Sequence, residues 1–260
     1  MIVGNRTTPK ELDARGRHRL AEALGDTPET VISIHFLHRG LCRAYVSGGP
    51  EHFAALIQSI EAPGEPTAFG EDARALWKIL HLTSDWWCVN VPDSLAPGLA
   101  AIMESEQLRC SARLYGDVHH TQVRPVPPAE NPDVRLLTPE DLPLVEAAPA
   151  VVRGTGFENP RTLLHEGIVA GALLSSGLAA IAFTSALTDR YADISVATLE
   201  GWHGRGFATA AASLVVRRVQ RSGRVPVWSA GEDNYASLQV ARKLGFVERF
   251  RRTYVIPERR

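Results

Sequence analysis

Residues 194–209 read ISVATLEGWHGRGFAT, and this stretch decides how the rest of the chain is interpreted. Its first five residues alternate β-branched with small side chains, a pattern that predicts a strand. Gly201, Gly204 and Gly206 follow, and glycine permits left-handed backbone angles and close approach to a ligand. From Phe207 onward apolar residues recur at helical spacing, and Gly223 is expected to end the helix.

A strand that enters a helix through a glycine turn presents several free N–H groups at one place. The positive end of the helix dipole lies at the same place. Both features favour a bound anion, and phosphate is the anion most often held in this way. The sequence therefore predicts a phosphate-binding turn before Phe207.

Three kinds of glycine turn compete as interpretations. A P-loop requires a Lys followed by Ser or Thr after the glycines, and this sequence has neither pair there. A dinucleotide-binding fold requires a third glycine where Thr209 stands, and also more βα units than the remaining chain can hold. A plain tight turn without a ligand remains open for this stretch taken alone.

The segment after the helix supplies a second pattern. A predicted strand at residues 225–229 is followed by Asn234, by Ser237 three residues later, and by a short helix that ends in Leu244-Gly245-Phe246. This arrangement resembles the GNAT superfamily of acyl-CoA N-acyltransferases. Their phosphate loop reads [Q/R]-x-x-G-x-[G/A], which residues 203–208 match as HGRGFA, and their later signature has the same Asn, Ser or Ala, and Leu-Gly-Phe. The resemblance covers about residues 133–257 and is strongest to the bacterial zwittermicin A resistance subgroup.

The resemblance implies an acyl-CoA-dependent N-acetyltransferase that moves an acetyl group from acetyl-CoA to a primary amine of a small molecule or peptide. It implies no metal, and it allows a homodimer. The residues that it assigns to the cosubstrate are Val196, Ala197 and Thr198 for the pantetheine arm, Asn234 and Ser237 near that arm, and His203, Gly204, Arg205, Gly206, Phe207, Ala208 and Thr209 for the pyrophosphate.

The catalytic groups are less well defined by the resemblance. A base must deprotonate the incoming ammonium, and Asp193 is our first candidate, with Glu200 second. The alternative to a catalytic role for Asp193 is a simple ion pair with Arg190. The alternative for Glu200 is a solvated loop position. In many relatives a tyrosine is proposed to protonate the departing thiolate, but here that position is Ala241.

The sequence also differs from the GNAT pattern at the start of the phosphate loop. There His203 replaces the usual Gln or Arg. Tyr235 and Tyr254 are candidates for a substitute acid, and ordinary packing is the alternative for each. The missing tyrosine also leaves open a second class of function, a non-catalytic acyl-CoA-binding or regulatory module.

The composition places limits on partners and compartment. Of 260 residues 45% are hydrophobic and 22% charged, as in soluble globular proteins, and the formal charge of −1 gives no drive toward nucleic acid or anionic membranes. The cysteines Cys42, Cys88 and Cys110 are scattered and form no disulfide framework. The first residues lack the apolar run of a targeting segment, so we expect a cytoplasmic protein. The adjacent pair His119-His120 lacks further ligands for a metal site.

The proline-rich segment RPVPPAENPD, residues 124–133, disfavours both helix and central strand. We therefore expect an N-terminal α/β domain at 1–123, a linker at 124–132 and the acetyltransferase domain at 133–260. The expected fold class is α/β (α+β), with a C-terminal mixed, mostly antiparallel sheet flanked by helices. The smaller N-terminal domain is open to interpretation as a degenerate copy of the same fold.

Local patterns predict the individual elements of the two domains. In the N-terminal part we expect helices at 9–24, 53–60, 72–82 and 97–104, and strands at 31–37, 41–46, 87–91 and 108–115. In the C-terminal part we expect strands at 134–137, 167–174 and 178–185, and a helix capped by Thr138 with Pro139 in its first turn.

Overall fold

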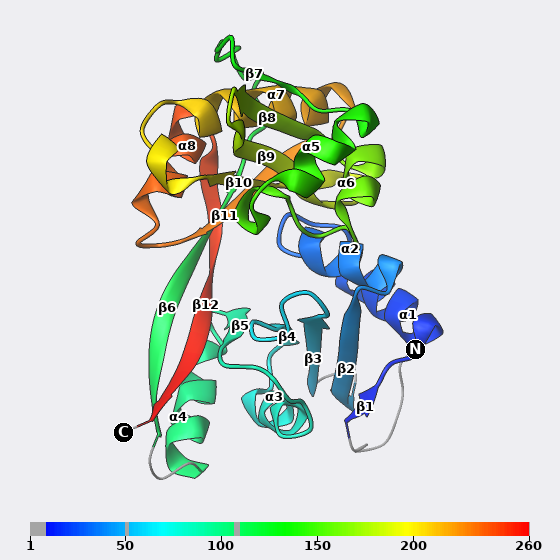
Figure 1. The fold of residues 1–260 in the computed structure, drawn as a ribbon. Helices are drawn as coiled ribbons and strands as arrows, with labels where there is room; N and C mark the ends of the chain where they lie inside the picture. Colours follow the sequence, from blue (N-terminus) through cyan, green and yellow to red (C-terminus); the bar gives the residue numbers. More distant parts are fainter. Residues whose placement is uncertain (1–8, 50–51, 107–109, 260) are drawn as a thin grey trace. The chain divides into compact units, whose positions relative to one another are not determined.

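The computed structural model describes residues 9–49, 52–106 and 110–259, which form two compact units (Figure 1). Unit 1 comprises Met1–Leu24, Phe36–Val118 and Phe250–Arg260, as far as these residues are described. Unit 2 comprises Gly25–His35 and His119–Arg249. Each unit thus takes residues from both the N-terminal and the C-terminal part of the chain.

Unit 2 is built on a mostly antiparallel sheet with the strand order β6-β11-β10-β9-β8-β7. β6 (Cys110–Thr121) contributes its last residues to this unit, and the pair β10 and β11 is parallel. The other strands are β7 (Val134–Leu136), β8 (Val169–Leu174), β9 (Gly177–Leu187), β10 (Tyr191–Thr198) and β11 (Val225–Gly231). The helices are α5 (Leu142–Ala147), α6 (Pro160–Glu166), α7 (Phe207–Arg221) and α8 (Tyr235–Lys243).

Helices cover both faces of this sheet. Ala211 and Val215 of α7 are fully buried with Ala182 of β9 and Ala192 of β10. On the other face, α5 and α6 pack on the large side chains of β9, such as Phe183. Because the strand residues facing α7 are mostly alanines, the helix lies close to the sheet and its ends are held firmly.

Unit 1 contains a sheet with the strand order β1-β2-β3-β4-β5-β12, in which only β4 and β5 pair in parallel. The strands are β1 (Lys10–Glu11), β2 (Cys42–Gly49), β3 (His52–Ser59), β4 (Thr67–Gly70), β5 (Val89–Pro92) and the end of β12 (Val247–Arg259). The helices are α1 (Ala14–Leu24), α3 (Ala73–Leu80), α4 (Ala96–Glu106) and the second part of α2 (Val31–Arg39).

The two parts of the chain repeat one topology. From β1 to β6 the order is a short strand, two helices, three strands, a helix, a strand, a helix and a strand, and the same order runs from β7 to β12. In both, the first three strand pairs are antiparallel and the fourth is parallel. The N-terminal part therefore has the topology of the C-terminal part.

Two predicted elements of the N-terminal part are wrong. The expected strand at 31–37 is helix α2, in which Val31, Ile34 and Leu37 are buried at helical spacing. The expected helix at 53–60 is strand β3, which pairs with β2 on one side and β4 on the other. Residues 54–57 are buried on both faces of the sheet, so they show no alternation by which the sequence could reveal a strand.

Smaller differences concern element ends. Helix α1 begins at Ala14 and not at Pro9, and the carboxylate of Asp13 accepts from Gly16 N–H at 2.8 Å. Thr8, which precedes the helix expected at 9–24, lies outside the described residues. His119 and His120 lie on β6. The helices expected at 72–82 and 97–104 are present as α3 and α4, and the C-terminal strands and helices follow the expected order.

Residues 25–35 form an integral part of unit 2. Val31 packs against Ala186 and Val227 in a small buried cluster. His35 is 4% exposed; its Nδ1 lies 3.2 Å from both the backbone nitrogen and the carbonyl oxygen of Leu187, and its Nε2 lies 2.8 Å from the Gly156 carbonyl oxygen. The buried imidazole ring therefore joins α2 to β9 and to the loop at Gly156 within unit 2.

The proline-rich segment also packs within unit 2. Val126 is buried, and its N–H donates to Gln220 Oε1 at 3.4 Å. The N–H of Ala129 donates to Ser213 Oγ at 3.0 Å. Both acceptors lie on α7, so this segment is fixed along the helix and does not act as a free tether. The expected boundaries at 1–123, 124–132 and 133–260 stay a prediction about separable domains, and a fragment that starts near Asn131 would lack Val31 and His35.

We predict that His35→Ala lowers the free energy of unfolding by about 2–5 kcal/mol, because it leaves the Leu187 N–H and the Gly156 carbonyl buried without this partner. Chemical denaturation measures the change. His38→Ala is the matched control, since His38 lies on the same helix with an exposed side chain. Equal destabilisation by the two substitutions would contradict this role of His35.

Candidate functional site

The strands β10 and β11 pair over three residues only and then diverge. Tyr191, Ala192 and Asp193 pair with residues 225–227, whereas β10 continues to Thr198 and β11 to Gly231. A register shift between Asp193 and Ile194 marks a bulge at the point of divergence. The edge of β10 from Ile194 to Thr198 that faces β11 is therefore open to an extended ligand with amide groups.

The turn after β10 has the backbone angles that the sequence predicts at two of its three glycines. Gly204 has φ +74° and Gly206 has φ +81°, in the left-handed region, whereas Gly201 does not. Residues 203–206 are exposed, and buried Phe207 fixes the start of α7. No oxygen within the described parts of the chain accepts from the N–H groups of residues 204–209. These donors point out of the protein beside the positive end of the α7 dipole.

His203 and Arg205 stabilise the turn and add charge to it. His203 Nε2 lies 2.8 Å from the Thr198 carbonyl oxygen, so the ring donates to it and fixes the turn onto the end of β10. The guanidinium of Arg205 lies 4.5 Å from the ring centroid of Trp202, which holds this cation at the turn. His203, expected to bind pyrophosphate, therefore has a positioning contact of its own.

The signature residues Asn234 and Ser237 form the start of α8. Asn234 Oδ1 accepts from Ser237 N–H at 3.2 Å and caps the helix. Ser237 Oγ in turn accepts from the indole N–H of buried Trp228 at 3.0 Å. Because β10 and β11 are parallel, α7 and α8 both begin at the same edge of the sheet. The residues that the resemblance assigned to the cosubstrate therefore lie at the carboxyl ends of these two strands or just after them.

Asp193 is buried at the point where β10 leaves β11. Its Oδ2 accepts from Ser185 Oγ at 2.5 Å, and Ser185 Oγ accepts from Ser195 Oγ at 3.1 Å. Two hydroxyl groups thus lead from half-buried Ser195 to the carboxyl group. Neither serine was predicted from the sequence; the only signal was a serine within each of two mostly apolar strands.

The alternatives for the acidic residues are resolved in part. The guanidinium of Arg190 lies over the ring of Tyr191 at 5.4 Å, and no bond from it to Asp193 is present. Its backbone N–H donates to Asp26 at 3.1 Å. Glu200 is exposed at the start of a short 3-10 helix, Glu200–Trp202, within the turn.

The position of the missing tyrosine is part of the core. Ala241 is 0% exposed and packs in the same cluster as Trp228 and Leu244. A tyrosine ring at this position would overpack the core. Tyr235 is 72% exposed. Tyr254 lies in unit 1, where burial raises the pKa of its hydroxyl group far above the ordinary range and makes it a weaker acid.

Unit 1 has a helix in the place of α7, but its N-terminus is already occupied. Only Glu71 and Asp72 connect β4 to α3. The carboxylate of Asp72 accepts from Arg74 N–H and Ala75 N–H, both at 2.9 Å. Glu71 and Asp72 repel a phosphate at this helix N-terminus, and Asp72 also accepts from its N–H donors, so α3 lacks the anion site that precedes α7.

The described residues show neither a metal-ligand cluster nor a membrane-spanning helix. In the described ranges no three or more His, Cys, Asp or Glu side chains gather as metal ligands would. None of the described helices combines the length and the apolar character that crossing a membrane requires.

Comparison with known proteins agrees with this geometry. Residues 154–256 match the family model of GNAT acetyltransferase. No curated protein matches the chain. Among solved structures, a GCN5-related N-acetyltransferase-like protein from Streptococcus suis 89/1591 aligns with a TM-score of 0.64 at 19% identity, over 94% of this chain and 99% of that one.

Two further structures align over most of both chains. A GNAT-family protein from Novosphingobium aromaticivorans DSM 12444 has a TM-score of 0.60 and 21% identity, over 90% of this chain and 100% of the other. A tandem GNAT protein from the clavulanic acid biosynthesis pathway has a TM-score of 0.55 and 16% identity, over 96% and 98%. The predicted resemblance is confirmed: the protein has the GNAT fold, and residues 154–256 match the GNAT acetyltransferase family model. Together these findings support acyl transfer as the general class of reaction. The zwittermicin subgroup stays a prediction.

Proposed function

We propose that the protein is an N-acetyltransferase that moves an acetyl group from acetyl-CoA to a primary amine of a small molecule or peptide. The observation that carries the proposal is the open edge of β10 leading into a turn whose N–H groups, residues 204–209, have no acceptor in the described chain. A long ligand with amides at one end and a pyrophosphate at the other matches both features at once.

The cosubstrate lies along β10 in this proposal. Its pantetheine amides pair with the backbone of residues 196–198, and its pyrophosphate receives the N–H groups of the turn. Arg205 supplies a nearby positive charge. Each of these interactions is modest by itself, since a helix N-terminus contributes about 0.3–1 kcal/mol toward an exposed anion. Affinity then depends on several donors acting together.

The reaction places the amine nitrogen against the thioester carbonyl near the bulge at Asp193. A C–N bond forms, the C–S bond breaks, and the CoA thiolate leaves. The proton that the attacking nitrogen loses as it becomes an amide passes through water to the thiolate, which leaves as the free thiol. An N–H of the open β10 edge stabilises the oxyanion. The ammonium must first lose a proton, and Asp193 receives it through Ser195 and Ser185, whose hydroxyl groups already donate in that direction.

The proposed setting is the cytoplasm, and the proposed acceptor is a small molecule or peptide. The formal charge of −1 offers neither nucleic acid nor an anionic membrane a strong electrostatic attraction. The face of the sheet that carries Ser185 also carries α5 and α6, and this side is the proposed entrance of the amine.

We predict that Gly206→Val abolishes the rise in melting temperature that acetyl-CoA causes in the natural protein. The added side chain meets no protein atom, but φ +81° is strained for valine and the turn must change. Gly223→Val is the matched control, because Gly223 has the same φ of +81° at the other end of α7. A thermal shift assay compares them, and an equal response to acetyl-CoA in both variants would place the phosphate site elsewhere.

We predict that one CoA molecule binds per chain, although the topology occurs twice. The turn before α7 has free donors, whereas the N-terminus of α3 is capped by Asp72. Isothermal titration calorimetry measures the stoichiometry. Two equivalent CoA sites per chain would show that the acidic cap of α3 does not exclude the pyrophosphate.

We predict that Asp193→Asn lowers kcat by about 10² to 10⁴, the usual contribution of a general base, and leaves CoA affinity unchanged. The pH profile should shift upward, because the variant reacts only with amine that is already neutral. Ser195→Ala, which removes the first hydroxyl without touching the buried carboxyl, should lower kcat in the same direction. Unchanged pH profiles in both variants would remove Asp193 from the mechanism.

The alternative class is a non-catalytic acyl-CoA-binding module, which the fully buried Ala241 in place of the tyrosine favours. Release of the CoA thiol from acetyl-CoA, measured with a panel of amines, distinguishes an N-acetyltransferase from a non-catalytic module. CoA binding at the turn without release of thiol from any amine would support the module.

A further inference from the structure

A second feature of unit 2 lies at the opposite end of α7 from the glycine turn. Residues 201–231 contain five arginines and no Asp, Glu or Lys. Four of these arginines, Arg217, Arg218, Arg221 and Arg224, lie in the last turns of α7 or just after it. The whole chain has a formal charge of only −1, so this segment is a strong local excess of positive charge.

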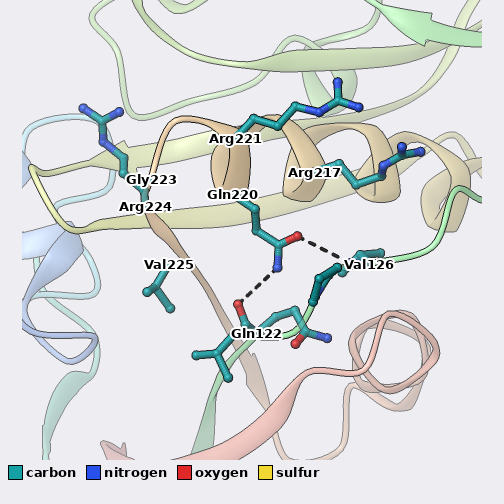
Figure 2. Close-up of a pocket in the computed structure, with 10 residues that line it drawn as sticks. Gln122, Val126, Arg217, Gln220, Arg221, Gly223, Arg224 and Val225 are labelled. Carbon is teal, nitrogen blue, oxygen red and sulfur yellow. Dashed lines mark hydrogen bonds between the residues drawn. The ribbon is translucent and has the colours of Figure 1, made fainter.

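Three of the four arginines line a cavity of about 470 Å³ (Figure 2). Arg217, Arg221 and Arg224 contribute to its wall, together with Gln122 and Gln220. Figure 2 shows Arg217 and Arg221 on one side of Gln220 and Arg224 on the other. A cavity of this size is in the range of small-molecule sites, and it is too small for a macromolecule.

Gln220 gives the cavity a defined wall. Its Nε2 donates to the carbonyl oxygens of Gln122 at 3.4 Å and Arg124 at 2.8 Å, and its Oε1 accepts from Val126 N–H at 3.4 Å. The buried side chain of Val126 anchors the same segment. The proline-rich segment and α7 are therefore joined, and the cavity between them has fixed walls.

The arginines are placed unfavourably unless an anion joins them. Arg217 and Arg221 are four residues apart on α7, where like charges repel. No carboxylate of the described residues forms an ion pair with either of them, although Arg217 is half-buried. Arg224 is held in place by bonds from Nε to the Thr188 carbonyl oxygen at 2.7 Å and from Nη1 to Ser222 Oγ at 3.2 Å.

The helix dipole explains only part of this pattern. Positive side chains in the last turn of a helix are favourable, which accounts for Arg218 and Arg221. It does not account for the half-buried Arg217, which also lines the cavity. A bound oxyanion would relieve the repulsion, because guanidinium groups bind phosphate with two parallel hydrogen bonds.

We propose that this cavity binds a small molecule that carries a phosphate monoester. A phosphate monoester concentrates a charge of about −1.5 to −2 on one group, which matches several guanidiniums better than a single carboxylate does. The site is separate from the glycine turn, since the 15 residues of α7 span about 22 Å. The proposal does not depend on the acyl-transfer function.

Calorimetric titration with inorganic phosphate tests the site. The double variant Arg217→Gln/Arg221→Gln should bind phosphate at least about tenfold more weakly than the natural protein, because charge-assisted hydrogen bonds are lost. Arg218→Gln is the matched control, since this exposed arginine lies on the same helix outside the cavity, and it should bind as the natural protein does. All variants are also prepared with Gly206→Val, so that the turn before α7 does not contribute.

Several outcomes would overturn the proposal. The natural protein could fail to bind millimolar phosphate, the double variant could bind it unchanged, or Arg218→Gln could weaken binding as much as the double variant does. Tighter binding of succinate than of phosphate would assign the cavity to dicarboxylates instead. The phosphate site would be supported if added salt weakens phosphate binding and if only the double variant, and not Arg218→Gln, reduces the affinity for phosphate.

Discussion

The candidate site depends on the short parallel pairing between β10 and β11. After three residue pairs, β10 leaves its parallel neighbour β11, and a bulge beside Asp193 marks the point. Antiparallel pairing with β9 continues through Thr198 while the other edge of β10 becomes free. Because α7 begins directly after this strand, the free edge and the helix N-terminus form one continuous surface of backbone donors.

Packing holds that surface in place. Alanines on β9 and β10 let α7 lie close to the sheet, and Phe207 fixes the first turn of the helix. His203 adds a bond to Thr198, so the turn is attached both to the strand before it and to the helix after it. An anion site made of backbone groups needs such support, since its donors act together only if the backbone is fixed.

The repeated topology shows how one arrangement of strands and helices can carry or lack a site. In unit 2 a glycine turn leaves the donors of α7 free, whereas in unit 1 Asp72 caps α3. Unit 2 also depends on residues from far away in the chain, because Val31 and His35 complete its core beneath β9 and β11. Unit 2 therefore includes residues from both sides of the proline-rich segment.

The sequence by itself determined the features that rest on interactions within a few residues: the left-handed glycines Gly204 and Gly206, the cap formed by Asn234 and Ser237, and the helix capped by Asp72. Only the tertiary structure decided that 31–37 is a helix and 53–60 a strand, since both segments are apolar without a clear period and their neighbours select the conformation. The same holds for the hydroxyl chain to Asp193, the buried position of Ala241 and the arginine cavity. Each of these joins residues from separate elements, and local sequence patterns contain no information about which distant side chains will meet.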